Sequence, residues 1–254
     1  MGILRRGTAP RYNPPELFSP SSKARLTDHD LDRFPGRTLF DRIARAVCHA
    51  ECLPRKELYE AWEVARRVRR VCRGGRIVDL AAGHGLLAQI MLILDDSSPN
   101  AVAVDTSLPA SSAKLHTALS DTWPQLTTRV VFEEHSLDTV PLFADDVIVS
   151  SHACGALTDL VIDRAIAARA RVAVLPCCHD LVTNDAGALS GWVDGPLAID
   201  IMRAVKLEQS GYEVRTQTIP ATVTPKNRLL IALPKGNFPD PSAVGEGEKV
   251  FLAR

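Results

Sequence analysis

The sequence predicts an α/β fold with a mainly parallel, seven-stranded sheet and a helical extension on its N-terminal side. Residues 76–105 contain a strand, a glycine-rich turn, a buried helix and a second strand, which together are typical of a βαβ unit. Farther along the chain, short apolar runs alternate with helical patterns, and this alternation indicates parallel strands joined by crossover helices. Two amphipathic helical patterns precede the first strand.

The unit at 76–105 begins with a short apolar strand over 77–80, into which Asp79 is set. A turn of small residues follows, then an apolar helix over 86–94 and a strand over 101–104 that ends at Asp105. A strand, glycine turn, helix, strand and acid in this order predict the first half of a nucleotide-binding unit.

Asp79 distinguishes between two classes of ligand for this turn. Residues 83–88 satisfy the dinucleotide pattern G-x-G-x-x-G/A, but a carboxylate beside the helix N-terminus would repel a pyrophosphate there. S-adenosylmethionine (SAM) carries a sulfonium and an ammonium instead, and an acid at the strand end favours both. A purely structural turn is the third alternative, and nothing in the sequence gives Asp79 a structural role. The sequence therefore favours SAM over a dinucleotide.

The run DLAAGHG over 79–85 resembles the glycine-rich motif of class I SAM-dependent methyltransferases. The resemblance implies a Rossmann-like class I methyltransferase fold with SAM as cofactor, and it implies that Asp105 is the acid that binds the ribose hydroxyls. Adenine contacts are expected after the third strand, from Ser136, Leu137 or Asp138. The cofactor contacts outside that loop would come from Asp79, Ala81, Gly83, Gly85 and Asp105.

The remaining pattern completes the alternation of strands and helices. Apolar runs predict strands over 129–132, 146–150 and 172–175, and a closing hairpin over 212–219 and 229–233. Helices are expected over 111–119, 156–168 and 199–209.

Four regions follow from these elements. Residues 1–35 are rich in Pro, Ser and Arg and are expected to form an extended or disordered arm. Residues 36–75 form the helical extension, in which Leu39, Ile43 and Val47 make one apolar stripe. Residues 76–234 are, by the resemblance, expected to be the SAM-binding methyltransferase domain, and residues 235–254 are expected to be a tail.

The charge is balanced overall but unevenly distributed. The chain holds 30 Lys and Arg against 30 Asp and Glu, whereas residues 1–75 hold 16 against 9. Four arginines lie close together on the second helix, which suggests RNA as a partner through phosphate contacts. A solvated helical surface is the alternative interpretation. The arginines are Arg66, Arg67, Arg69 and Arg70.

No apolar run is long enough to span a bilayer, and the first residues lack the apolar core of a secretory signal. The six cysteines are too sparse for a disulfide scaffold, so we expect reduced thiols and a cytoplasmic protein. Cys48 and Cys52, with His49 between them, have metal-like spacing, but no second Cys/His pair lies at zinc-finger distance. A helix end with small buried thiols is the favoured interpretation.

Histidines and cysteines follow both the fourth and the fifth strand. Because ligands bind at the carboxyl ends of strands in such sheets, these two loops should be neighbours above the sheet. They contain His152, Cys154, Cys177, Cys178 and His179.

Three roles are open for these side chains. His152 or His179 would act as a general base for the attacking group. Alternatively, Cys177 or Cys154 would attack a pyrimidine ring covalently. In the third case the cluster binds zinc or only packs. Since neighbouring side chains on an extended backbone point in opposite directions, Cys177 and Cys178 should diverge, and no metal is predicted.

A narrower resemblance concerns these two loops. SHACGALTDL over 151–160, followed by LPCCH over 175–179, resembles the eukaryotic tRNA acceptor-stem ribose 2′-O-methyltransferase family and a broader methyltransferase-like group. The segment TPKNR over 224–228 resembles a closing element of that group. Asp180 stands where the tRNA family has a second histidine, and that family's N-terminal Cys/His zinc modules have no counterpart.

The resemblance implies methyl transfer to RNA, with a tRNA ribose 2′-hydroxyl as the leading acceptor and with His152, Cys177 and His179 facing it. A small molecule or a protein is the alternative acceptor. A non-catalytic SAM- or metal-binding module and an NAD-dependent oxidoreductase are the remaining alternatives.

Overall fold

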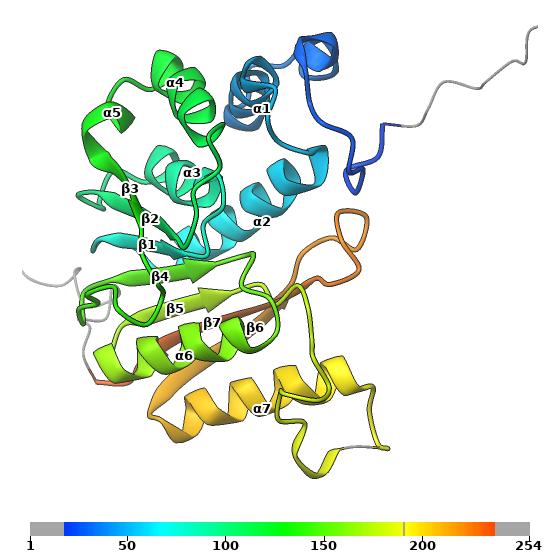
Figure 1. The fold of residues 1–254 in the computed structure, drawn as a ribbon, viewed down its shortest axis with the longest axis vertical. Coiled ribbons are helices and arrows are strands. Elements are labelled where there is room, and N and C mark those ends of the chain that lie inside the picture. Colours follow the sequence, from blue (N-terminus) through cyan, green and yellow to red (C-terminus); the bar gives the residue numbers. More distant parts are fainter. Residues whose placement is uncertain (1–17, 190, 237–254) are drawn as a thin grey trace, which may run out of the picture.

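A computed structural model describes residues 18–189 and 191–236. Its centre is a seven-stranded sheet in the order β3-β2-β1-β4-β5-β7-β6, in which β1 to β5 are parallel and β7 runs antiparallel to both of its neighbours (Figure 1). The predicted α/β class, the parallel sheet and the closing hairpin are confirmed. The strands are β1 Ile77–Leu80, β2 Ala101–Asp105, β3 Val130–Glu134, β4 Val147–Ser150, β5 Arg171–Val174, β6 Tyr212–Thr218 and β7 Arg228–Pro234.

Helices cover both faces of the sheet (Figure 1). On one face lie α1 Leu39–Ala50, α2 Arg55–Val71, α3 Leu86–Leu94, α4 Ser112–Thr122 and the short α5 Leu126–Arg129. The other face carries α6 Ala156–Ala168 and α7 Gly195–Gln209. The N-terminal extension continues the first layer, because α2 packs against α3 and α1 against α4. In the described residues, no helix has both the length and the apolar character needed to cross a membrane.

The central strands β1, β4 and β5 are buried along their whole length and mainly apolar, because helices cover them from both sides. Val147 and Val149 belong to the core under α3, whereas Ile148 between them belongs to the core under α6. β1 and β4 are adjacent and parallel, and the strand order reverses between them. In doubly wound sheets this reversal opens a crevice at the carboxyl ends of the strands, which is where ligands bind.

The segment before α1 differs from its prediction. Residues 18–35 were expected to belong to an extended arm, yet Leu26 and Phe34 are 0% and 2% exposed. The Leu26 N–H donates to the Leu53 carbonyl at 2.9 Å, and a short 3-10 helix, Asp28–Arg33, lies between the two apolar anchors. Leu26, Phe34 and this backbone hydrogen bond therefore hold the mainly polar segment 18–35 against the N-terminal helices. The rest of the predicted arm, 1–17, and the tail from 237 lie outside the described residues.

Asp79 has a structural role that the sequence did not reveal. The residue before α3 is Gly85, which has no side chain to cap the helix. The Asp79 carboxylate takes that place and accepts the Ala88 N–H at 3.2 Å. Its side chain is 2% exposed, and burial raises the pKa of Asp79 to about 8, although the Ala88 N–H favours the charged form. The expectation that no structural role exists for Asp79 was wrong.

Leu26→Ala should lower the free energy of unfolding by about 2–5 kcal/mol, because it removes a fully buried side chain and leaves a cavity. Urea unfolding followed by circular dichroism measures this. The matched control is Lys23→Ala, an exposed position nearby whose loss should change the stability by less than about 0.5 kcal/mol. Equal stability of the two variants would mean that residues 18–35 do not pack on the helices.

Asp79→Asn should give a variant whose stability advantage over the wild type grows between about pH 5 and about pH 8. In the unfolded chain the carboxyl ionises near 3.8, whereas in the folded chain it stays protonated up to about 8. The folded state therefore binds more protons in this window, and the wild type loses stability as pH rises through it. Asparagine keeps an oxygen for the Ala88 N–H and does not titrate.

Urea unfolding of both proteins across this pH range provides the measurement. Asp96→Asn, at a side chain that is 89% exposed, is the control for replacing an aspartate outside the core. A difference between Asp79→Asn and wild type that is constant with pH would refute the buried, protonated carboxyl.

Candidate active site

Residues predicted to bind the cofactor lie together at the carboxyl ends of β1, β2 and β3. Ala81, Asp105, Ser136 and Leu137 line one hollow of about 90 Å³, although they come from three different loops. Leu157 and Leu160 of α6 complete its wall, and the sequence did not indicate them because they read as ordinary helix positions. Of the three candidates after β3, Ser136 and Leu137 reach this hollow.

The glycine turn has the backbone that a close-approaching ligand requires. Ala81, Gly83 and Gly85 all have positive φ angles, of 57°, 53° and 70°. Nothing lies within 4 Å of where a Cβ of Gly83 would be, so this side of the turn is open. At Gly85 a Cβ would sit 2.6 Å from the Phe132 ring, which requires glycine there.

Asp105 joins the turn to the end of β2. Its Oδ2 accepts the Gly83 N–H at 2.9 Å. Its Oδ1 receives only long contacts, 3.4 Å from the Thr106 hydroxyl and 3.5 Å from the Ser107 N–H. One carboxylate oxygen therefore keeps most of its capacity to accept hydrogen bonds from a ligand.

A second hollow lies on the α2 side of the glycine turn. His152, from the loop after β4, lines it together with Ala82 and His84 of the turn and Glu57 of α2. The His84 Nε2 is 2.9 Å from the Ser111 hydroxyl. Burial lowers the pKa of His84, with Glu57 opposing this shift and His152 adding to it. Two imidazoles and a carboxylate therefore share the space between the turn and β4, where they can hold or accept a proton.

Three thiols converge where the loops after β4 and β5 meet. The Sγ atoms of Cys154 and Cys177 are 2.8 Å apart, and those of Cys154, Cys177 and Cys178 all lie within 4.8 Å of one another. The expectation that Cys177 and Cys178 diverge was wrong, because β5 ends at Val174 and both cysteines lie in an irregular loop. Backbone contact joins the two loops, since the Gly155 N–H donates to the Cys178 carbonyl at 3.2 Å.

The three thiols have different acidities. Contact with the Cys154 thiol lowers the pKa of Cys178, and the ammonium of Lys226, 3.6 Å from its Sγ, acts in the same direction. Burial raises the pKa of Cys177 instead. Negative charge in this cluster is therefore favoured at the Cys178 sulfur, on the exposed side beside Lys226.

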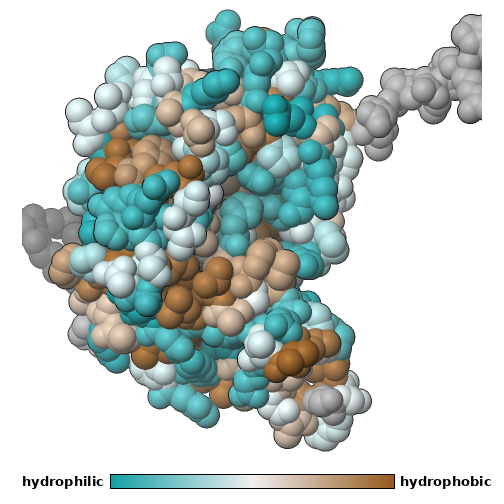
Figure 2. Space-filling view, viewed as in Figure 1, coloured by the Kyte–Doolittle hydropathy of each residue, from teal (hydrophilic) through white to brown (hydrophobic). Residues whose placement is uncertain are grey.

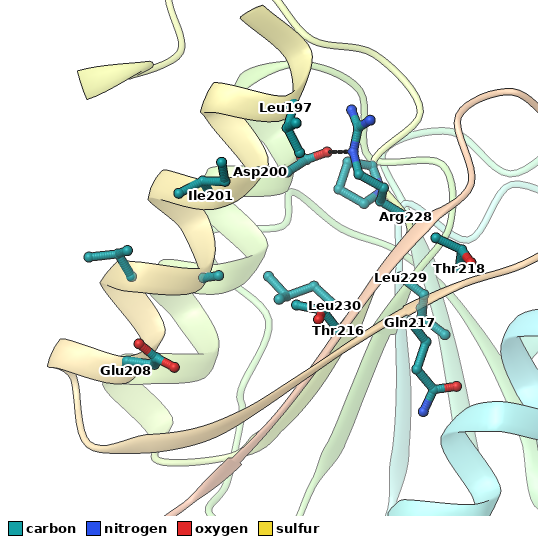
Figure 3. Close-up of a pocket in the computed structure, with 13 residues that line it drawn as sticks. Leu197, Asp200, Ile201, Glu208, Thr216, Gln217, Thr218, Arg228, Leu229 and Leu230 are labelled. Carbon is teal, nitrogen blue, oxygen red and sulfur yellow. Dashed lines mark hydrogen bonds and ion pairs between the residues drawn. The ribbon is translucent and has the colours of Figure 1, made fainter. Parts of the chain in front are cut away.

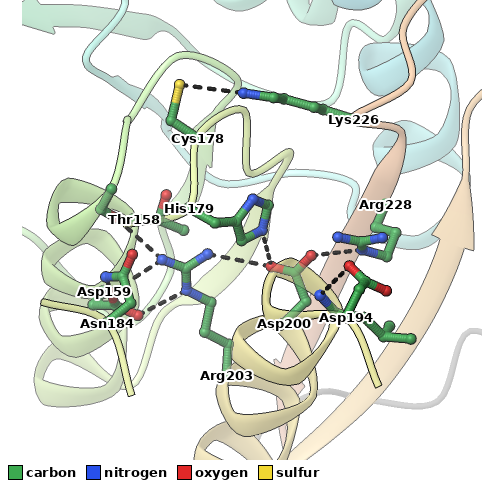
Figure 4. A network of polar contacts seen from close by, with 12 residues as sticks. Thr158, Asp159, Cys178, His179, Asn184, Asp194, Asp200, Arg203, Lys226 and Arg228 are labelled. Atoms are coloured by element: carbon green, nitrogen blue, oxygen red, sulfur yellow. Dashed lines mark hydrogen bonds and ion pairs between the residues drawn. The ribbon is translucent and has the colours of Figure 1, made fainter. Parts of the chain in front are cut away.

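His179 is not part of the thiol cluster. Its side chain is 4% exposed, and its Nε2 lies 2.8 Å from Asp200 Oδ1 of α7 (Figure 4). Asp200 also accepts hydrogen bonds from Arg203 at 3.2 Å and from Arg228 at 2.7 Å. His179 is thus held by α7, and the catalytic assignments of His152, Cys177 and His179 stay predictions.

Thr158 and Asp159, in the first turn of α6, support the same framework (Figure 4). The Thr158 hydroxyl donates to the Ala153 carbonyl at 2.6 Å. Arg203 donates to both Asp159 oxygens, at 2.7 and 3.0 Å, and to the Gly155 carbonyl at 3.1 Å. Arg203 thus connects α7 to α6 and to the loop after β4. The sequence did not reveal this, because Arg203 is 44 residues from Asp159.

A groove of about 630 Å³ separates α7 from the hairpin of β6 and β7 (Figure 3). Apolar side chains, including Leu197, Ile201 and Leu230, line most of it, and Pro176 of the loop after β5 borders it. The ion pair of Asp200 and Arg228 lies at one end. The groove depends on how α7 packs, so no local pattern predicts it.

Most arginines of α2 already have partners in the molecule. Arg66 and Arg67 pair with Glu63, and Arg69 is buried against Asp95. The surface over the N-terminal helices is largely hydrophilic (Figure 2). Three of the four arginines expected to contact phosphates therefore have acidic partners within the protein, and Arg70 is exposed.

The other cysteine pair behaves as the helix-end interpretation predicted. Cys48 is buried near the end of α1, and Cys52 is half-buried just beyond it. Glu51 adopts the left-handed conformation that ends the helix. In the described residues, 18–189 and 191–236, three side chains lie close enough together to bind a metal ion. They are Cys154, Cys177 and Cys178.

Solved structures similar to this chain include other methyltransferases. An O-methyltransferase family protein of Burkholderia thailandensis is 18% identical, with a TM-score of 0.48, and the match covers 85% of this chain and 66% of that one. The tRNA methyltransferase TrmK of B. subtilis is 12% identical, with a TM-score of 0.45, and the match covers 68% of this chain and 64% of that one.

A curated relative, a glutathione S-transferase C-terminal domain-containing protein of Xenopus laevis, is 27% identical over 122 residues. That match covers 34% of this chain and only 20% of the relative. A model of a methyltransferase domain family matches residues 56–185, just over half of the chain, from α2 to the loop after β5. The fold, the residues around the glycine turn and this match lead to one conclusion: the chain belongs to the methyltransferase domain family, with a Rossmann-like α/β fold.

Proposed function

We propose that this protein transfers a methyl group from SAM, bound across the glycine turn, to an acceptor over the loops after β4 and β5. The observation that carries the proposal is the convergence of Ala81, Asp105, Ser136 and Leu137 on one hollow beside the open face of Gly83. These residues were expected to contact the cofactor, and they come from three separate loops. A purely structural turn does not need this convergence.

Each wall of the hollow suits a part of the cofactor. The Oδ1 of Asp105 has free capacity for ribose hydroxyls, because its present contacts are long. Leu137 and Leu157 provide apolar surface for a purine ring. SAM supplies an electrophilic methyl group, and the chain's residues position the acceptor and remove its proton. We assign proton removal to His152, because it lies in the loop after β4 and lines the hollow beside the glycine turn.

We propose RNA, at a ribose hydroxyl, as the acceptor. The support is the resemblance of the loops at 151–160 and 175–179 to those of a tRNA ribose methyltransferase family. The basic helix α2 adds less support than its composition suggested, because Arg66, Arg67 and Arg69 are paired internally.

A small apolar molecule is the second candidate. It is favoured by the groove of about 630 Å³ between α7 and the β6–β7 hairpin, which lies within the volume range of small-molecule sites. The groove is bordered by Pro176, which directly precedes the cysteines of the loop after β5.

Asp105→Asn should weaken SAM binding by about 10- to 100-fold, the effect of losing hydrogen bonds to a charged group. The variant keeps an oxygen that can accept the Gly83 N–H, so the turn is preserved. Isothermal titration calorimetry measures the affinity, and Asp96→Asn is the control with an exposed aspartate. Unchanged SAM affinity in Asp105→Asn would show that the cofactor site is elsewhere, and binding of NADH without SAM would contradict the proposal.

Incubation with tritiated SAM and separate pools of RNA, protein and small metabolites from cells should label RNA. His152→Ala should lower the transfer rate by about 100-fold while SAM binding is kept, because a general base acts on the transfer step. Label in the metabolite pool alone would contradict RNA as the acceptor. It would support a small molecule, with the groove between α7 and the β6–β7 hairpin as its candidate site. Absence of label in all pools, with SAM bound, would contradict a catalytic role.

A further inference from the structure

We infer that Cys154, Cys177 and Cys178 form a zinc site with three thiolate ligands and an open fourth position. Neither the SAM hollow nor the proposed proton transfer by His152 uses these thiols. The inference does not rest on the proposed function, because it follows from the arrangement of the two loops. It departs from the sequence-based prediction, which excluded a metal on the ground that Cys177 and Cys178 diverge.

The distances between the sulfurs suit a shared metal ion. Zinc binds thiolates at about 2.3 Å, which in a tetrahedral site separates neighbouring sulfurs by about 3.8 Å. All three Sγ atoms lie within 4.8 Å of one another. The pair at 2.8 Å, Cys154 and Cys177, needs to open by about 1 Å for this geometry. Cys154 is exposed and lies outside regular structure, so its side chain has room for that adjustment.

The backbone that carries the thiols is held from several sides. The Gly155 N–H donates to the Cys178 carbonyl, which joins the two loops next to the sulfurs. Arg203 binds Asp159 and the Gly155 carbonyl, and it also contacts Asp200, the partner of His179. Ligands on such a framework lose little conformational freedom when a metal binds.

The local charge also favours a metal–thiolate centre. Three thiolates and one Zn²⁺ carry a net charge of about −1, from the formal charges of ligands that must be deprotonated. The Lys226 ammonium, 3.6 Å from Cys178 Sγ, supplies the compensating positive charge. A disulfide between Cys154 and Cys177 would explain neither the nearby Cys178 sulfur nor the Lys226 ammonium beside it.

No histidine completes the group. His179 is buried and its Nε2 is bound to Asp200, while His152 lines the hollow at the glycine turn. Structural zinc sites have four protein ligands, whereas sites that exchange a ligand have three and an open position. Since Cys154 and Cys178 are exposed, the fourth position is accessible to water or to an exchangeable sulfur or oxygen ligand.

The test measures metal on the full chain without reference to activity. Protein purified without chelators should contain about one zinc ion per chain by elemental analysis. Cys154→Ser, Cys177→Ser and Cys178→Ser should each lower zinc affinity at least tenfold in competition with a chromophoric chelator. Lys226→Met should lower it by about fivefold, because a nearby charge has a modest effect at an exposed site. Cys52→Ser, which alters a half-buried cysteine outside the cluster, is the control and should keep full affinity.

Cobalt substitution of the wild-type chain keeps the test valid if a serine variant does not fold. Co²⁺ should give sulfur-to-metal charge-transfer absorption with the intensity of three thiolates and the visible bands of a tetrahedral centre. A metal-free chain that does not take up zinc or Co²⁺ would overturn the inference. A chain lighter by about 2 Da, with Cys154 linked to Cys177 after purification without reductant, would overturn it in favour of a disulfide.

Discussion

The structure depends on two carboxylates that hold the turn between β1 and α3. Asp79 accepts the Ala88 N–H from below the turn, and Asp105 accepts the Gly83 N–H from the neighbouring strand. Gly85 cannot cap the helix itself, and its position against the Phe132 ring leaves no room for a side chain that could. Capping therefore has to come from the strands. The same bonds orient the turn, its open face and the hollow lined by Asp105.

Burying the Asp79 carboxyl under the turn makes its ionised form unfavourable. Asp79 is buried and its pKa is raised to about 8, with Asp105 contributing to the rise. A cationic ligand above the turn would favour the ionised form of Asp79. A pyrophosphate there would favour the protonated form instead. A cationic and an anionic ligand would therefore shift the pKa of Asp79 in opposite directions.

A single buried cation holds the loop after β4 and α6 to α7. Arg203 of α7 contacts Asp159 of α6, the Gly155 carbonyl and Asp200, and Asp200 in turn binds His179 of the loop after β5. Arg228 also binds Asp200. His179, which the sequence analysis expected to face the acceptor, is bound to Asp200 of α7, and the thiols that were expected to diverge lie together. Pro176 of the loop after β5 also borders the groove under α7, so this loop contributes to both the thiol cluster and the groove.

The sequence by itself determined the elements, the fold class and the turn at 79–85, because hydrophobic periodicity and glycine spacing are local signals. It also predicted that Ala81, Asp105, Ser136 and Leu137 lie together, since the carboxyl ends of parallel strands meet at one edge of the sheet. Only the tertiary structure decided which way side chains point between elements. In the folded chain the arginines of α2 pair with acidic residues, and residues 18–35 pack against the helices. His179 binds Asp200, and the three cysteines lie together. These contacts join residues far apart in the chain, and no local pattern encodes them.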